Sequence, residues 1–227
     1  MERIPEPELM DEAEQAAAYA RADFEEPHSR FIALLSEKLE ALPATGFALD
    51  LGTGSGDIAL RFARAFAQWE IDGVDGAPAM LAFARRDAEE AGLGRRVRFT
   101  EAFLPAGSLP RDAYGLVFSN SLLHHLADPA ILWESVRRFA APGGSVFVMD
   151  LLRPDSRERA QELVDCYAEN EPDVLRRDFY NSLLAAYRLE EISAQLAAAG
   201  LAQALRVEVV SDRHFIAFGR LAAAKTD

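Results

Sequence analysis

Residues 47–57 constrain the fold of this chain more than any other segment. They read FALDLGTGSGD, an apolar strand with an acid at Asp50, followed by the alternate glycines Gly52, Gly54 and Gly56 and then by a helical pattern. Glycine adopts positive φ and lets the backbone pass close beneath a ligand. The pattern predicts a strand-to-helix turn that holds a ligand, and a plain glycine-rich turn is the weaker interpretation.

Two neighbouring features indicate which ligand the turn holds. A dinucleotide fingerprint needs Gly-x-Gly-x-x-Gly, but the sixth position counted from Gly52 is Asp57, a carboxylate where a pyrophosphate would lie. A phosphate-gripping loop needs Gly-Lys-Ser or Gly-Lys-Thr, and no lysine stands near. One strand-helix unit later an apolar strand ends at Asp75, a carboxylate suited to a ribose diol or, alternatively, to capping the next helix. The ligand is therefore expected to carry a ribose and no phosphate, while Asp72, inside the same strand, is expected to face solvent.

Short apolar strands alternate with amphipathic helices over most of the chain. Strands are expected at 47–51, 69–74, 97–100, 114–119 and 145–150, with helices at 57–67, 77–91 and 128–140 between them. This alternation predicts a parallel sheet covered on both faces. A helix at 189–199 ends at Gly200, and strands at 204–210 and 214–219 lie three residues apart, which predicts an antiparallel hairpin.

The flanking segments define the expected domains. Two helical patterns, at 7–26 and from 27 to 42, predict that residues 1–46 form an N-terminal helical cap or lid on a domain of residues 47–227. Residues 152–188 follow the fifth strand and read as one or two helices. They are either a substrate cap or ordinary helices that complete the fold.

Composition excludes several classes of protein. The 24 basic and 37 acidic residues give a net charge of −13, and nine of the acids lie in residues 1–26, so nucleic acid and anionic membranes are disfavoured as partners. The single cysteine, Cys166, excludes an intramolecular disulfide and is expected to be a passive buried thiol. Without a visible signal peptide or an apolar run of about 20 residues, the chain is expected to be cytoplasmic, as a monomer or a homodimer.

Four motifs together resemble a known family. They read LDLGTGSGDIAL, GVDGAPAMLAFAR, YGLVFSNSLLHHLADP and RRFAAPGGSVFVMDLLRP, and the resemblance covers residues 47–153. They resemble the class I S-adenosylmethionine-dependent methyltransferases, particularly the small-molecule branch similar to the ubiquinone and menaquinone biosynthesis enzymes. The resemblance implies an α/β fold: a Rossmann-like, seven-stranded, mostly parallel sheet with helices on both faces, a C-terminal antiparallel hairpin and the N-terminal helical cap. It also implies S-adenosyl-L-methionine as cofactor and a small-molecule methyl acceptor.

The resemblance assigns roles to individual residues. Asp50, Gly52 and Gly54 would line the methionine part of the cofactor, and Asp75 would bind the ribose. Glu101 stands where the family usually has an aspartate for the adenine amino group, and Ala102 would offer its backbone N–H to the ring. The full set of expected cofactor-binding residues is Tyr19, Asp50, Gly52, Thr53, Gly54, Gly56, Asp75, Gly76, Glu101, Ala102, Ser119 and Asn120. Tyr19 belongs to the proposed lid, and Ser119 and Asn120 would face the transferred methyl group.

Methyl transfer is an in-line displacement, and orientation alone can contribute ~7–11 kcal/mol to it. A base is needed only where the acceptor must lose a proton, and His124 and His125 are then the catalytic candidates; the alternative is that they only pack. No metal is expected, because neighbouring histidines should point apart and no third ligand is evident. The expected substrate-binding residues are Phe24, His124, Tyr180 and Asn181. Two other functions stay open: a non-catalytic S-adenosylmethionine-binding regulatory protein and, more weakly, an NAD-dependent oxidoreductase.

Overall fold

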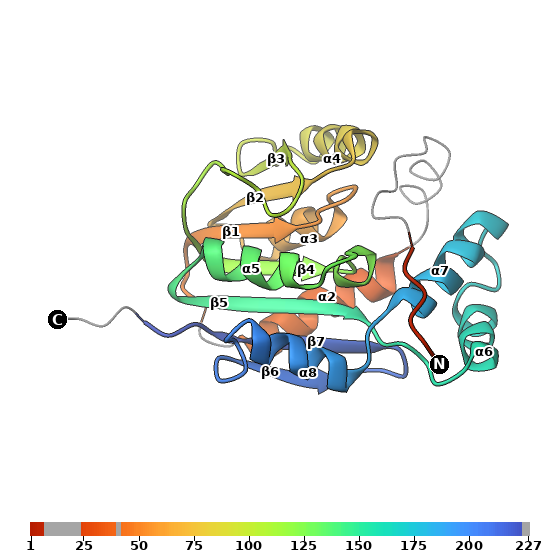
Figure 1. Cartoon of the computed structure of the whole chain (residues 1–227). Coiled ribbons are helices and arrows are strands. Elements are labelled where there is room, and N and C mark those ends of the chain that lie inside the picture. The colour runs from red at the N-terminus through yellow and green to blue at the C-terminus, as the bar shows by residue number, and fades with distance from the viewer. Residues whose placement is uncertain (7–23, 40–41, 224–227) are drawn as a thin grey trace.

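A seven-stranded sheet organises the computed structural model, which describes residues 1–6, 24–39 and 42–223 (Figure 1). The strands are β1 (Gly46–Leu51), β2 (Trp69–Asp75), β3 (Val97–Glu101), β4 (Tyr114–Asn120), β5 (Ala140–Leu151), β6 (Leu205–Val209) and β7 (His214–Arg220). Their order across the sheet is β3-β2-β1-β4-β5-β7-β6. Strands β1 to β5 are parallel, and β7 runs antiparallel between β5 and β6. The predicted fold class, with its C-terminal hairpin, is confirmed.

Helices cover both faces of this sheet. They are α2 (Glu25–Lys38), α3 (Asp57–Ala65), α4 (Pro78–Glu90), α5 (Ala130–Phe139), α6 (Arg157–Tyr167), α7 (Asp173–Ala185) and α8 (Leu189–Ala198), with a 3-10 turn η1 (Leu123–His125). In Figure 1, α5 and α8 lie in front of the sheet and α2 and α3 behind it. None of the helices in the described part of the chain combines the length and the apolar character that crossing a bilayer requires.

Successive side chains of each strand point to opposite faces of the sheet, which explains why helices pack on both faces. In β4, Leu116 and Phe118 pack in the core shared with α2 and α3, whereas Val117 between them packs in the core shared with α5 and α8. From α2, the buried Phe31 ring lies edge-on to Phe147, with 5.1 Å between the ring centroids. Helix α2 thus belongs to the layer of helices that covers this face of the sheet.

Three details correct the sequence interpretation. β5 begins at Ala140, five residues before its predicted start, because Ala140 pairs with Tyr114 ahead of a shift in register. Asp72 is buried, not solvent-facing, and its carboxylate accepts from Arg111 at 2.7 Å and from the Tyr114 hydroxyl at 2.9 Å. Cys166 is exposed and free, not buried.

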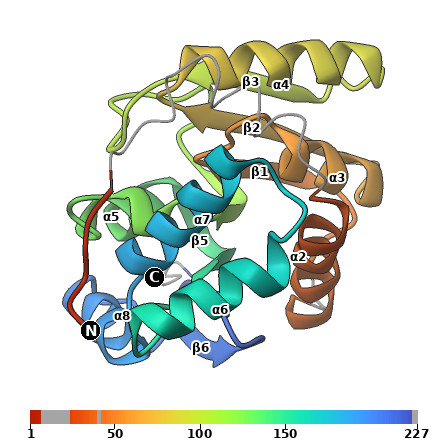
Figure 2. The same cartoon turned by 90° about the vertical axis from the view of Figure 1, so that its right-hand side faces the viewer.

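The carboxyl ends of the parallel strands meet at one edge of the sheet, where α6 and α7 also lie (Figure 2). These two helices pack on each other through a small apolar cluster that includes Leu163 and Leu183. The first residues of the chain run beside α7, where the Ile4 amide donates to the Leu184 carbonyl at 3.0 Å. The segment 152–188 therefore forms two helices, and its role as a substrate cap stays a prediction.

Candidate functional site

A cavity opens at the carboxyl ends of β1, β2 and β4. The glycine-rich turn forms one wall, with positive φ at Gly52 (71°) and Gly54 (52°). The amides of Gly52 and Thr53 both donate to the Val74 carbonyl, which fixes the turn against β2. Nine of the expected site residues line this cavity: Asp50, Gly52, Thr53, Gly54, Asp75, Gly76, Ala102, Asn120 and His125.

Asp50 is the least exposed of the acids that line the cavity. It is 1% exposed, and its carboxylate accepts a hydrogen bond from the Thr53 hydroxyl at 2.7 Å. Burial raises the pKa of Asp50 to about 7, and the nearby Asp75 acts in the same direction. Asp50 thus holds a proton more readily than an ordinary aspartate, and a cationic ligand group beside it would favour its charged form.

Asp75 faces the same cavity from the end of β2. Its two carboxylate oxygens accept from the amides of Gly54 and Ala77, each at 2.8 Å. Burial raises the pKa of Asp75, although these backbone hydrogen bonds oppose the shift. Each carboxylate oxygen keeps a second lone pair, so both can also accept from a ligand diol.

Four expected cofactor-binding residues have other contacts. Gly56 directly precedes α3 with φ of 80° and lies so close to Phe99 that a Cβ there would come within 2.8 Å of its ring. Ser119 is buried and donates to the Leu51 carbonyl, a contact between β1 and β4. Glu101 is exposed, and none of Gly56, Ser119 and Glu101 is among the described residues that line the cavity. Ala102 lines it, but its amide donates to the Asp75 carbonyl at 3.0 Å, which corrects its expected role as the donor to adenine.

The expected substrate residues are also placed differently from the sequence interpretation. Among the described residues, Phe24, His124, Tyr180 and Asn181 lie outside the cavity lining. Phe24 stacks on His28 with 5.0 Å between centroids, Tyr180 packs on the apolar cluster of α6 and α7, and Asn181 is exposed. Tyr19 falls in residues 7–23, outside the described part of the chain.

Sequence reasoning missed His28 and Phe103, which both line the cavity. His28 reaches it from α2 and pairs with Asp57 at 2.6 Å, and Arg61 binds the same carboxylate oxygen at 2.7 Å. Burial raises the pKa of Asp57, but the hydrogen bonds from His28 and Arg61 outweigh it and hold the pKa below its usual value. Phe103 is 64% exposed and follows β3. Neither residue belongs to a motif with a recognisable spacing, so only the folded chain identifies them.

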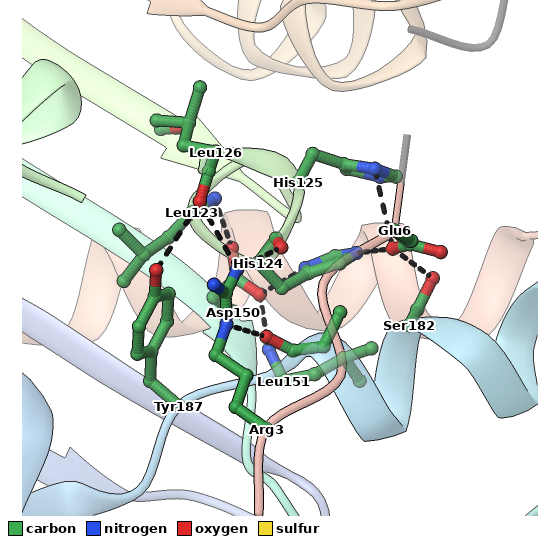
Figure 3. A network of polar contacts seen from close by, with 12 residues as sticks. Arg3, Glu6, Leu123, His124, His125, Leu126, Asp150, Leu151, Ser182 and Tyr187 are labelled. Carbon is green, nitrogen blue, oxygen red and sulfur yellow. Dashed lines mark hydrogen bonds and ion pairs between the residues drawn. The ribbon is translucent and has the colours of Figure 1, made fainter. Parts of the chain in front are cut away.

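The two histidines of η1 lie together, contrary to the expectation that they point apart. Their ring centroids are 4.2 Å apart, and both rings face Glu6, the third titratable group that the sequence did not reveal (Figure 3). His124 Nδ1 contacts the buried Asp150 carboxylate at 2.5 Å. Burial lowers the pKa of His124, but the charge and hydrogen bond of Asp150 outweigh it, so the pKa is raised. For Asp150, burial raises the pKa, but His124 outweighs it and the pKa is lowered.

Arg3 fixes the N-terminal segment beside this cluster. Its guanidinium donates to the carbonyls of His124 and Leu126 at 2.9 and 3.1 Å and lies 4.2 Å from the centre of the Tyr187 ring. The residues of these contacts are more than 120 positions from Arg3 in the chain, so no local pattern could have indicated them.

A Rossmann-like sheet with two acids and a glycine-rich turn at one edge defines a class of nucleoside-binding α/β proteins. Within that class, residues 48–144 match the family model of a methyltransferase domain. The resemblance that the four motifs carry is thereby confirmed.

Curated relatives agree with this assignment. Over 106 residues the chain is 40% identical to the demethylmenaquinone methyltransferase of Thermus thermophilus, and this aligned region makes up 47% of each protein. Over 141 residues it is 33% identical to the trans-aconitate 2-methyltransferase of Methylobacterium radiotolerans, and this aligned region makes up 62% of this chain and 49% of the relative. The matches thus span about half the length of these two relatives.

Solved structures show the same fold. A SAM-dependent methyltransferase from Aquifex aeolicus superposes with a TM-score of 0.58 at 18% identity, over 86% of this chain and 98% of the other. The plantazolicin methyltransferase BpumL, in complex with a pentazolic desmethylPZN analog and SAH, superposes with a TM-score of 0.70 at 13% identity, over 92% of each chain. The methyltransferase domain and this fold together imply S-adenosylmethionine as the cofactor.

Proposed function

We propose that this protein transfers a methyl group from S-adenosylmethionine to a small-molecule acceptor. One observation carries the proposal: Asp50 and Asp75 end two adjacent parallel strands and line one cavity with the glycine-rich turn between them. The methyltransferase domain and the relatives named above support the same reaction.

The residues of the cavity fit this cofactor. S-adenosylmethionine carries an ammonium group, a sulfonium and a ribose diol, and it lacks phosphate. The Asp50 carboxylate, whose burial disfavours its charge, suits the ammonium, and the Asp75 oxygens suit the diol. At Gly54 the Met80 methyl is the one described group within 4 Å of where a Cβ would stand, at 3.4 Å, so the turn presents bare backbone to the ligand.

The same geometry disfavours a dinucleotide. Asp57 is the first residue of α3 and lines the cavity, so a pyrophosphate placed at this helix N-terminus would meet a carboxylate. That carboxylate is held in place, and held charged, by His28 and Arg61. An NAD-dependent oxidoreductase is therefore the weaker candidate.

The acceptor side of the cavity combines an apolar surface with a polar edge. Leu104, Leu122 and Leu126 provide the apolar part, while Asn120 and His125 provide the polar part. We propose that a small acceptor places its apolar body on the leucines and its reacting group toward His125. The bound cofactor supplies the electrophilic methyl group. The protein orients the two reactants and excludes water, and His125 accepts a proton where the acceptor must lose one.

Two further parts of the site are proposals. We propose that α6 and α7 cap the acceptor, because both lie at the carboxyl edge of the sheet and α7 contacts η1. We also propose that the segment containing Tyr19 and Phe24 acts as a lid. Replacing Tyr19 with Ala should then weaken cofactor binding without lowering thermal stability, and an unchanged affinity would refute the lid.

The proposed function is tested with the purified full chain in two steps. Calorimetric titration with S-adenosylhomocysteine should show saturable binding, whereas titration with NADH should show none. Incubation with methyl-labelled S-adenosylmethionine and a fractionated metabolite extract should then label a small-molecule acceptor. Binding of S-adenosylhomocysteine without any labelled product would contradict catalysis and favour the regulatory binder. Binding of NADH alone would contradict the cofactor assignment.

A further inference from the structure

Three side chains from two segments far apart in the sequence bring one metal-ligating atom each to a common point. Glu6 Oε1 lies 3.5 Å from His124 Nε2 and 3.3 Å from His125 Nδ1, and all three atoms lie within 4.8 Å of one another. Figure 3 shows both imidazole rings directed at the Glu6 carboxylate. Two histidines and one carboxylate are a ligand set that zinc accepts in proteins.

The distances fit a tetrahedral ion. Zinc bonds of about 2.0–2.2 Å to nitrogen and oxygen place neighbouring tetrahedral ligand atoms about 3.3–3.5 Å apart. Both distances from Glu6 match this separation. The third edge, between His124 Nε2 and His125 Nδ1, measures at most 4.8 Å, and a bound ion would draw these two nitrogens toward the same separation.

The surroundings of these ligands are those of a supported metal site. Asp150 is 1% exposed and holds His124 Nδ1 at 2.5 Å, which directs Nε2 to the common point, as a carboxylate does behind a zinc-binding histidine. Asp150 is itself fixed, since it accepts from the amides of Leu123 and Leu151 at 2.7 Å. The Ser182 hydroxyl donates to Glu6 at 3.0 Å.

The charge of the site also favours a divalent cation. Glu6 and Asp150 bring two carboxylates, which the guanidinium of Arg3, bonded to the His124 carbonyl, balances only in part. His125 lines the cofactor cavity as well, so an ion on these ligands would be reached from the cavity at its fourth position. We propose that Glu6, His124 and His125 bind a divalent cation of the zinc class, with an open position toward the acceptor. With the ion bound, His125 Nδ1 is a metal ligand, so the proton-accepting role proposed for His125 applies to the metal-free protein.

This proposal differs from a purely hydrogen-bonded cluster in one measurable respect, the binding of metal. The test uses zinc ion alone, titrated into the full chain with Cys166→Ser as background, because the exposed thiol is itself a zinc ligand. One zinc ion should bind per chain. Glu6→Gln and His125→Asn should each weaken zinc binding by about tenfold or more. Removing a group that only hydrogen-bonds to a metal ligand already lowers metal affinity by this factor, and removing the ligand itself should lower it at least as much.

Two matched variants control for nonspecific binding. Glu2→Gln removes an exposed carboxylate of the same N-terminal segment, and His214→Gln removes a histidine of the β6–β7 hairpin. Both should keep the parent affinity. If the parent binds no zinc, or if Glu6→Gln and His125→Asn bind as tightly as the two controls, the proposal is wrong.

Thermal unfolding separates metal binding from a structural role. Zinc should raise the Tm of the parent, and Glu6→Gln should lose most of this increase while its metal-free Tm stays near that of the parent. A hydrogen-bonded cluster without metal predicts the opposite: a lower metal-free Tm for Glu6→Gln and no zinc-dependent increase in the parent. Neither measurement requires methyl transfer, so the metal site and the proposed function can fail independently.

Discussion

Replacing Gly56 with Ala separates the packing role of the glycine-rich turn from its ligand-binding role. Gly56 has φ of 80°, and an added Cβ would lie 2.8 Å from the Phe99 ring and 2.9 Å from the Ala84 methyl. Gly92 offers a matched control, because it has φ of 67° but no atom of residues 1–6, 24–39 or 42–223 within 4 Å of its Cβ position. Gly54 provides the third case, with φ of 52° and one flexible neighbour.

The expected costs follow from these contacts. Left-handed backbone costs a residue with a Cβ about 1–2 kcal/mol, and the smaller entropy of the unfolded Ala chain returns about 0.4–1 kcal/mol. Gly92→Ala should therefore lower the free energy of unfolding by about 1 kcal/mol. Gly56→Ala adds a clash with a ring and a helix methyl, worth about 1–3 kcal/mol, for a total of about 2–4 kcal/mol.

Urea unfolding followed by circular dichroism measures these differences, with an unchanged m-value showing that the same surface unfolds. Calorimetry with S-adenosylhomocysteine gives the second readout. Gly54→Ala should cost about as much stability as Gly92→Ala but weaken ligand binding by about tenfold or more, because Gly54 lines the cavity. Equal destabilisation by Gly56→Ala and Gly92→Ala would refute the assigned contact of Gly56.

Three further predictions concern the acids. Asp75→Asn should weaken S-adenosylhomocysteine binding by about 10–100-fold, because charged hydrogen bonds are lost, whereas Glu101→Gln, at an exposed position, should leave the calorimetric affinity unchanged. A larger loss of affinity for Glu101→Gln than for Asp75→Asn would instead support Glu101 as the adenine-binding residue. The affinity for S-adenosylhomocysteine should rise with pH up to about 7 and then level off, because the pKa of Asp50 is raised and its carboxyl group must lose a proton at lower pH before it can pair with the ligand ammonium. Asp50→Asn should remove this pH dependence, and an affinity of Asp50→Asn that still rises with pH would contradict the assignment. Arg111→Met should destabilise the protein by about 3 kcal/mol in urea unfolding, because it removes one partner of the buried Asp72 carboxylate; a loss below about 1 kcal/mol would show that the other partners of Asp72 suffice.

Local patterns predicted the sheet because each strand carries its own signal. The alternation of apolar strands and amphipathic helices reflects burial on two faces, and Gly200, with φ of 70°, ends α8 as expected. The interpretation failed where long-range contacts decide. Asp72 has the position of a surface charge in its strand, yet Arg111, 39 residues later, makes its burial possible.

The candidate site divides along the same line. The turn from Gly52 to Gly54 and the acids Asp50 and Asp75 were predictable, since their spacing within strand-turn-helix units fixes their positions. Glu6 and Arg3 were not, because their partners in η1 and α7 lie more than a hundred residues away and meet them only in the folded chain. The same holds for the close approach of the two histidine rings, which depends on the 3-10 turn.

Four acids of the fold, Asp50, Asp72, Asp75 and Asp150, differ in whether a cationic side chain pairs with them. A carboxylate that lacks such a partner can indicate a ligand site. Asp72 is held by Arg111 and Asp150 by a histidine, so the fold itself provides the opposite charge for both. Asp50 and Asp75 accept instead from a hydroxyl and from amides, and burial raises the pKa of each. Burying a carboxylate without a cation costs stability, and such a cost is characteristic of sites where a ligand completes the electrostatics. Of these four acids, Asp50 and Asp75 are the ones that line the cavity, and both have raised pKa values, whereas His28 and Arg61 compensate the charge of Asp57, which also lines it. This correspondence supports a ligand that brings its own cation to Asp50 and its own hydrogen-bond donors to Asp75.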